Sequence, residues 1–152
     1  MERMDKMSGS DDRIHAGFSQ FKKAFSDHWK NGSKGDDPSY YLLRFYSVEC
    51  GLKSMYIDKE DTFRKMNSND MPDHGHRLDW WLKELKISAS EISPPPRFIL
   101  NSSINISSPR EIHRSHEAWR YGVKMDQTKE KLLLEWFDKA EKYIKDYLQE
   151  AM

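Results

Sequence analysis

The stretch DPSYYLLRFYSVECGLKSMYI, residues 37–57, has the start signal and the apolar spacing of a long helix. Asp37 is suited to cap the helix, and Pro38 to its first position, where a missing N–H costs no hydrogen bond. Apolar residues then recur at helical spacing through Tyr41, Phe45, Val48, Leu52 and Met55. Gly51 costs a helix about 1 kcal/mol relative to alanine. Its place beside this stripe therefore predicts the close approach of a neighbouring helix.

Helices are also predicted over residues 13–30 and 127–150 and, as a shorter helix, within residues 73–86, because the apolar residues there recur every three or four positions. The apolar face of the first of these helices starts at Ile14. No segment shows the strict alternation or the hairpin turns that are typical of a sheet. The chain is therefore expected to be built from helices.

A long loop is predicted over residues 88–108, because the three prolines at 94–96 exclude a helix there. Residues 98–100, Phe-Ile-Leu, are expected to form a short extended piece packed on the bundle. From Ser108, the sequence Ser-Pro-Arg-Glu has the pattern of a capping box, which predicts a fourth main helix starting there. Gly122 is the expected end of that helix.

The sequence thus predicts an all-α fold, an up-and-down bundle of four main helices with a short helix and a long proline-containing loop. A length of 152 residues suits a single domain spanning 1–152, with residues 1–12 expected to be flexible. Cys50 is the only cysteine, which fits a reducing compartment. No run approaches a membrane span, so a cytoplasmic protein without membrane contact is expected.

The charges balance, with 25 Lys and Arg against 25 Asp and Glu. This neutrality excludes a broadly basic nucleic-acid binder but permits a small local phosphate site. There is no glycine-rich phosphate loop, no Gly-x-Ser-x-Gly elbow and no His-Glu-x-x-His, so no cofactor is expected. The pairs His74/His76 and His113/His116 have metal-like spacing but no obvious further ligand, so no metal site is expected.

The segment REIHRSH, residues 110–116, carries the candidate catalytic residues Arg110 and His116. An arginine can hold a phosphate while a histidine moves protons, and together these suffice for metal-free RNA cleavage by the 2′-hydroxyl. On a regular helix the two residues are about 120° apart, so they converge only if Arg110 reaches around or a second subunit contributes. The alternative is that His116, on the stripe of Ile112 and Trp119, is a hydrogen-bonded core or interface residue.

The other candidate site residues fall into two groups. His113, Arg114 and Arg120 are candidate phosphate or RNA contacts, although a solvated surface is their simpler explanation. Trp80, Trp119 and Tyr121 are candidate interface residues. Core packing of Trp119 is favoured over base stacking, and Glu49 with Lys53 is interpreted as a surface salt bridge.

Three segments, YYLLRFYSVECGLK (residues 40–53), GHRL (75–78) and HEAWRY (116–121), resemble the motifs of the HEPN superfamily. The resemblance implies a four-helix up-and-down bundle that often dimerises. Many members are metal-independent ribonucleases of toxin–antitoxin, abortive-infection and other prokaryotic defence systems, with an Arg-x4–6-His motif at the dimer cleft. Arg110 and His116 have that spacing, but Glu111 departs from the Asn, Asp or His that commonly follows the arginine.

The resemblance therefore predicts a cytoplasmic homodimer that cuts RNA and has an antitoxin or another defence-complex protein as its partner. Because many HEPN-like proteins lack catalysis, a noncatalytic interaction or dimerisation module of a larger complex is the alternative. Binding of a small nucleotide without turnover is a third hypothesis.

Overall fold

The computed structural model describes residues 12–101 and 108–150 of the chain. The predicted flexible segment 1–12 lies outside the described residues except for Asp12. In chain order the elements are α2 (Phe18–Gly32), α3 (Pro38–Glu60), the 3-10 turn η1 (Ser68–Asp70), α4 (Leu78–Glu84), the 3-10 turn η2 (Ile112–Arg114), α5 (Ser115–Tyr121) and α6 (Gln127–Glu150). Within the described ranges there is no strand, only isolated β-bridges, so the all-α prediction is confirmed.

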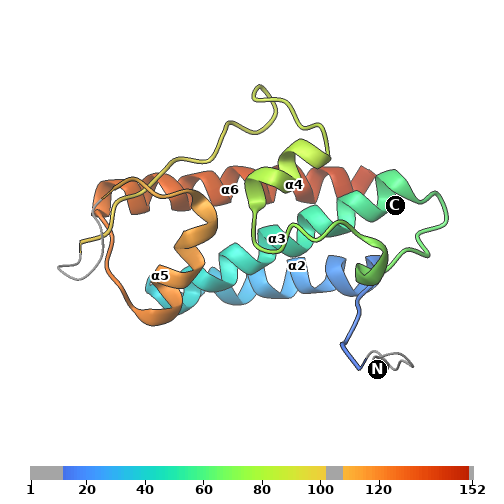
Figure 1. Cartoon of the computed structure of the whole chain (residues 1–152), viewed down its shortest axis with the longest axis horizontal. Helices are drawn as coiled ribbons and strands as arrows, with labels where there is room; N and C mark the ends of the chain where they lie inside the picture. Colours follow the sequence, from blue (N-terminus) through green and yellow to red (C-terminus); the bar gives the residue numbers. More distant parts are fainter. Residues whose placement is uncertain (1–11, 102–107, 151–152) are drawn as a thin grey trace, which may run out of the picture.

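Helix α3 is the centre of the fold and contacts each of the four other α-helices (Figure 1). Its start is as predicted, because the Asp37 carboxylate accepts a hydrogen bond from the backbone N–H of Ser39 at 2.9 Å. Helix α2 runs antiparallel to α3, whereas α6 runs in the same direction as α3 (Figure 1). Three long helices therefore form the body of the molecule.

At Gly51 the three long helices approach one another closely. A Cβ added there would lie 2.7 Å from side-chain atoms of both Phe25 on α2 and Ile144 on α6. The Ser47 hydroxyl, one turn earlier, donates to the Phe25 carbonyl at 2.7 Å. The close helix approach predicted from Gly51 is confirmed.

The first helix begins later than predicted. Residues 13–17 lie outside α2, because Gly17 is extended and pairs with Asn67 in an isolated β-bridge. Ile14 is 97% exposed and does not belong to the core. The predicted helix starts about one turn too early. The backbone of Ala16 forms its hydrogen bonds with Ser68, after α3, and so does not join the helix.

The predicted helix start at Ser108 is wrong. Arg110 pairs with Phe98 in a β-bridge whose two N–H to carbonyl distances are 2.8 and 3.1 Å. The Glu111 carboxylate accepts from Arg97 instead of closing a capping box. Burial of Phe98 in the core holds this segment extended, so the fourth main helix shrinks to the turn η2 and the seven-residue α5.

The remaining predictions for the second half of the chain are confirmed in outline. The extended piece after the three prolines packs on the bundle through Phe98 and through the Leu100 to Met125 bridge. Gly122 ends α5 with a φ of 67°, and α6 spans the predicted residues. Helix α4 is short and lies within the predicted range 73–86. In the part of the chain that the structure describes, no helix combines the length and hydropathy needed to cross a membrane.

Candidate active site

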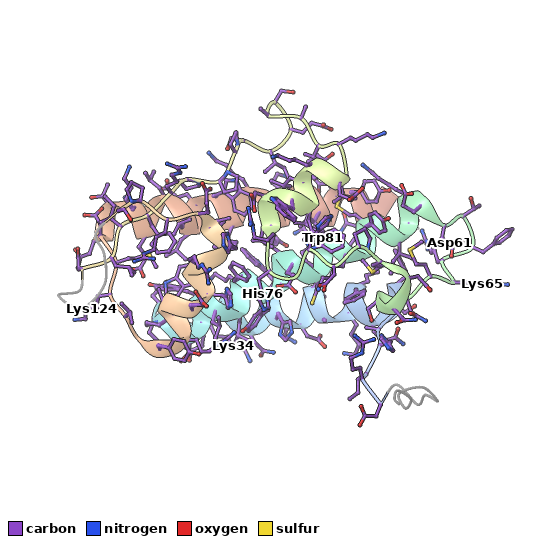
Figure 2. All side chains as sticks on the ribbon, viewed as in Figure 1. Lys34, Asp61, Lys65, His76, Trp81 and Lys124 are labelled. Carbon is purple, nitrogen blue, oxygen red and sulfur yellow. The ribbon has the colours of Figure 1, made fainter. Side chains whose placement is uncertain are left out.

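The rings of two histidines from distant parts of the sequence lie in close contact. His116 lies on α5, and His76 lies two residues before α4. Their ring centroids are 4.2 Å apart, with an angle of 43° between the ring planes. The ring of Phe45 on α3 also packs against His116, at 5.2 Å between centroids. Figure 2 shows His76 near the middle of the molecule, in front of α3.

Glu49 on α3 fixes the orientation of His76. One oxygen of its carboxylate lies 2.7 Å from His76 Nδ1, and the other accepts from Lys53 Nζ at 2.8 Å. The residue is only 8% exposed. Burial opposes its ionisation, but the hydrogen bond from His76 and the charge of Lys53 outweigh it and lower the Glu49 pKa. An ionised carboxylate only accepts hydrogen bonds, so Nδ1 of His76 carries a proton and Nε2 is its free end.

His116 is held by its own helical turn. Its Nδ1 donates to the backbone carbonyl of His113, which fixes the proton on that nitrogen. Burial is the main cause that lowers the His116 pKa, and the neighbouring His76 adds to it. The ring is therefore neutral at pH 7, with a lone pair on Nε2.

A tyrosine and an arginine extend this pair toward solvent. The ring of Tyr46 on α3 lies 6.2 Å from that of His76. Its hydroxyl oxygen accepts a hydrogen bond from the guanidinium of Arg120 at 3.2 Å. Arg120 is exposed, so it presents a positive charge beside the two histidines.

The residues of this cluster, which we call the histidine pair site (Tyr46, Glu49, His76, His116 and Arg120), have the composition of a proton-transfer site. Two imidazoles tied at Nδ1 can exchange protons through Nε2, and a fixed Nδ1 partner is the usual way a protein orients such a ring. The carboxylate stabilises a protonated His76, and Arg120 can attract an anion. Across residues 12–101 and 108–150, no group of three His, Cys, Asp or Glu side chains has the arrangement of a metal site.

Arg110, the predicted phosphate clamp, has different neighbours from His116. It lines a groove of about 350 Å³ together with Phe98, Arg114 and Tyr121. The hydrogen bond and ring contacts of His116 go to His113, His76 and Phe45 instead. The backbone at Arg110 is extended, so Arg110 and His116 do not share one helix. Their different neighbours follow from this.

The predicted phosphate contacts are divided between two places. Arg120 belongs to the histidine pair site, whereas Arg114 lies in the groove and donates to Glu117 at 2.9 Å. His113 is half-buried, and burial and the charges of Arg77 and Arg114 lower its pKa. Its Nδ1 is buried without a hydrogen bond to any described residue.

The three predicted interface residues differ in exposure. Trp80 is 42% exposed and has the guanidinium of Arg77 at 4.4 Å from its ring centre. Tyr121, at the end of α5, is 70% exposed. Trp119 is buried in the core, where its indole N–H donates to Glu130 at 2.9 Å. Packing in the core, rather than base stacking, is therefore its place in this chain.

Sequence reasoning missed His76 and Glu49. His76 was interpreted as a loop histidine and Glu49 as half of a surface salt bridge, because neither position is distinctive by local spacing. A usable signal was present, since Glu49, His76 and Arg120 each lie in one of the three segments that resemble the HEPN motifs. Comparisons of the chain with protein-family models, with curated proteins and with solved structures found no match.

Proposed function

We propose that this chain is a HEPN-like, metal-independent endoribonuclease whose proton-transfer groups are His76 and His116. The observation that carries the proposal is the close approach of the two imidazoles, 4.2 Å between centroids, each with its Nδ1 in a hydrogen bond. RNA supplies its own nucleophile, the 2′-hydroxyl, so a base, an acid and a cation are sufficient for its cleavage.

In the proposed reaction, neutral His116 accepts the 2′-hydroxyl proton at Nε2 while O2′ forms a bond to phosphorus. The bond from phosphorus to O5′ breaks, and protonated His76 donates its Nε2 proton to that leaving oxygen. The products are a 2′,3′-cyclic phosphate and a 5′-hydroxyl end. The ionised Glu49, at 2.7 Å from Nδ1, stabilises the positive charge of His76 before the transfer.

Arginines supply the phosphate contacts in this proposal. Arg120, held by Tyr46 at 3.2 Å, lies where it can stabilise the charge that develops on the reacting phosphate. In this proposal Arg110 and Arg114, in their groove beside α5, hold neighbouring phosphates of the strand. A few positioned arginines suit a chain of zero net charge, because they need no broadly basic surface.

The family, assembly and cellular setting are part of the same proposal. Its support is that the three HEPN-like segments contribute Glu49, His76 and Arg120 to one cluster. In an up-and-down bundle the second and fourth helices run in the same direction. Helices α3 and α6 do so, and α5 takes the place of the third helix. We infer a cytoplasmic homodimer of a prokaryotic defence or toxin–antitoxin system with an antitoxin or defence-complex partner.

The direct test is cleavage of a single-stranded RNA in buffer containing EDTA. Removal of a positioned acid or base costs about 10²- to 10⁴-fold in rate. His76→Ala and His116→Ala are each expected to lose that much. Mass spectrometry of the products is expected to find 2′,3′-cyclic phosphate ends.

His74→Ala is the matched control, because His74 lies in the same loop but pairs with Glu84 at 2.9 Å. It is expected to cut RNA at the parental rate. Equal cleavage by the parent and by His116→Ala, with folding confirmed by circular dichroism, contradicts the catalytic assignment.

A noncatalytic interaction module is the second candidate function. The observation that favours it is the burial of His116, which is 6% exposed and faces its own bundle. The exposed Tyr121 and Trp80 then provide the contact surface. A dimer in light scattering that dissociates in Tyr121→Ala, together with no RNA cleavage by the parent, supports this alternative.

A further inference from the structure

A cavity of about 370 Å³ lies between the segment before α2, the turn η1 and the loop before α4. Its polar lining includes Arg13, Lys53, Ser68, Asn69 and Asp73, and its inner wall includes Trp81. The volume is in the range of small-ligand sites, which are about 300 to 1,000 Å³. The charged and amide groups make a lipid or another apolar molecule a poor occupant.

Hydrogen bonds between distant segments hold the cavity wall in place. The hydroxyl of Ser68 lies 3.2 Å from His15 Nδ1 and accepts from the backbone N–H of Ala16 at 3.0 Å. The backbone N–H of Ser68 donates in return to the Ala16 carbonyl at 2.8 Å. On the inner side, the indole of Trp81 donates to the Gly75 carbonyl at 3.3 Å. The cavity is thus a preformed feature of the fold.

The cavity shares a wall with the histidine pair site. Gly75 lines the cavity and directly precedes His76 in the chain. Lys53 also lines it, and the Glu49 carboxylate that accepts from Lys53 at 2.8 Å is the one bound to His76 at 2.7 Å. A ligand in the cavity therefore lies one side chain away from the proposed acid.

We propose that this cavity is a nucleotide subsite, which binds the nucleoside adjoining the phosphate cleaved at the histidine pair site. The inference rests on the proposed function for the position of that phosphate. Among the described lining residues, Arg13 and Lys53 are cationic and Asp73 is anionic, and the Lys53 ammonium is already paired with Glu49 at 2.8 Å, so the lining offers a nucleoside polar groups of both signs. The Asn69 amide can donate and accept, and Asp73 can accept from a base amino group, so together they can contact the edge of a nucleobase.

Binding is tested with 3′-nucleoside monophosphates as probes and with inorganic phosphate as the comparison, monitored by NMR of the labelled full chain. The backbone amides of Ser68 and Gly75 and the indole N–H of Trp81 are expected to shift, with Kd at least tenfold lower for the nucleotides than for phosphate. Equal affinity for phosphate, or shifts confined to other residues, overturns the proposal.

The variant Arg13→Ala/Asn69→Ala is expected to weaken nucleotide binding by about tenfold or more while the chain remains folded, because both side chains are exposed. Asn31→Ala/Lys34→Ala is the matched control, with an exposed amide and an exposed cation at the far end of α2. Figure 2 shows Lys34 well away from the segment before α2. Equal weakening in both double variants overturns the assignment of the cavity.

The two proposals fail in different ways. If RNA is cut by the parent but not by His116→Ala, and nucleotides do not shift the cavity resonances, only the nucleotide subsite is wrong. If nucleotides bind at the cavity but no RNA is cut, the subsite stands as a nucleotide-binding site and the ribonuclease assignment is wrong. Binding is measured from the NMR signals of Ser68, Gly75 and Trp81, none of which is a proposed catalytic residue.

Discussion

The imidazoles of His76 and His116 lie 4.2 Å apart between ring centroids, with their planes tilted by 43°. Burial is the main cause that lowers the His116 pKa, and at this separation the charge of His76 adds to it. Of the two rings, only that of His76 has a hydrogen bond to the Glu49 carboxylate, at 2.7 Å. His116, which is buried and bonded to a neutral carbonyl, is left as the base.

The assignment of His116 as the base predicts how the rate of RNA cleavage depends on pH in the acid range. Burial lowers the His116 pKa from its ordinary value of 6.5, so half of the His116 rings become protonated only at a pH below 6.5. The rate of RNA cleavage, measured as kcat/KM, is expected to fall with acid only below pH 6.5. An acid limb above pH 6.5 contradicts the assignment of His116 as the base. NMR titration of His116 in His76→Gln is expected to give a higher pKa, because the repulsion by His76 is gone.

Glu49→Gln is expected to reduce stability in a pH-dependent way. The Glu49 pKa in the folded protein lies below its ordinary value of 4.5, so the carboxylate contributes stability above that pH and loses it as the pH falls through the folded pKa. At pH 7 the free energy of unfolding is expected to fall by about 1–3 kcal/mol, because Lys53 and His76 lose a charged partner. Urea unfolding from pH 7 to pH 3 measures this.

The difference between the parent and Glu49→Gln is expected to shrink as the pH approaches 3. Asp27→Asn is a suitable control, because Asp27 pairs with Lys23 on the exposed face of α2. Exposed pairs contribute only about 0–1 kcal/mol. A constant difference between the parent and Glu49→Gln across this pH range contradicts the argument.

Gly51→Ala is expected to destabilise the protein although alanine favours helices. The added Cβ meets Ile144 and Phe25 at 2.7 Å, and such overpacking costs about 1–3 kcal/mol. The midpoint of urea denaturation is the measurement. In a double-mutant cycle with Ile144→Ala, the combined loss is expected to be smaller than the sum of the single losses. Strict additivity contradicts a direct contact.

Gly122→Ala is expected to cost about 1 kcal/mol for a different reason. The residue has a φ of 67°, which is unfavourable for a side chain, but an added Cβ has no neighbour within 4 Å. Gly122→Asn is expected to lose less, because asparagine tolerates this conformation. Thermal unfolding of both variants checks the order, and an equal loss contradicts a purely backbone cause.

The sequence by itself determined the features that depend on neighbouring residues. The start of α3 at Pro38, the extent of α6 and the end of α5 at Gly122 follow from caps, periodicity and glycine, and all three are confirmed. Gly51 predicted a close helix approach because a glycine inside a long helix needs a packing reason. These signals are local and act through the backbone of one segment.

Only the tertiary structure decided which polar groups meet. The capping-box pattern at Ser108 does not form a helix start, because Arg110 pairs with Phe98 instead. Burial of the Phe98 ring stabilises the fold by more than the roughly 1 kcal/mol that a helix cap contributes. That pairing gave Arg110 and His116 different surroundings. His116 contacts His76 instead. Both α4 and α5 pack against α3, and this brings the segment before α4 next to α5. Helical periodicity specifies which face of a segment is buried, but the residues opposite that face depend on contacts between segments distant in the chain.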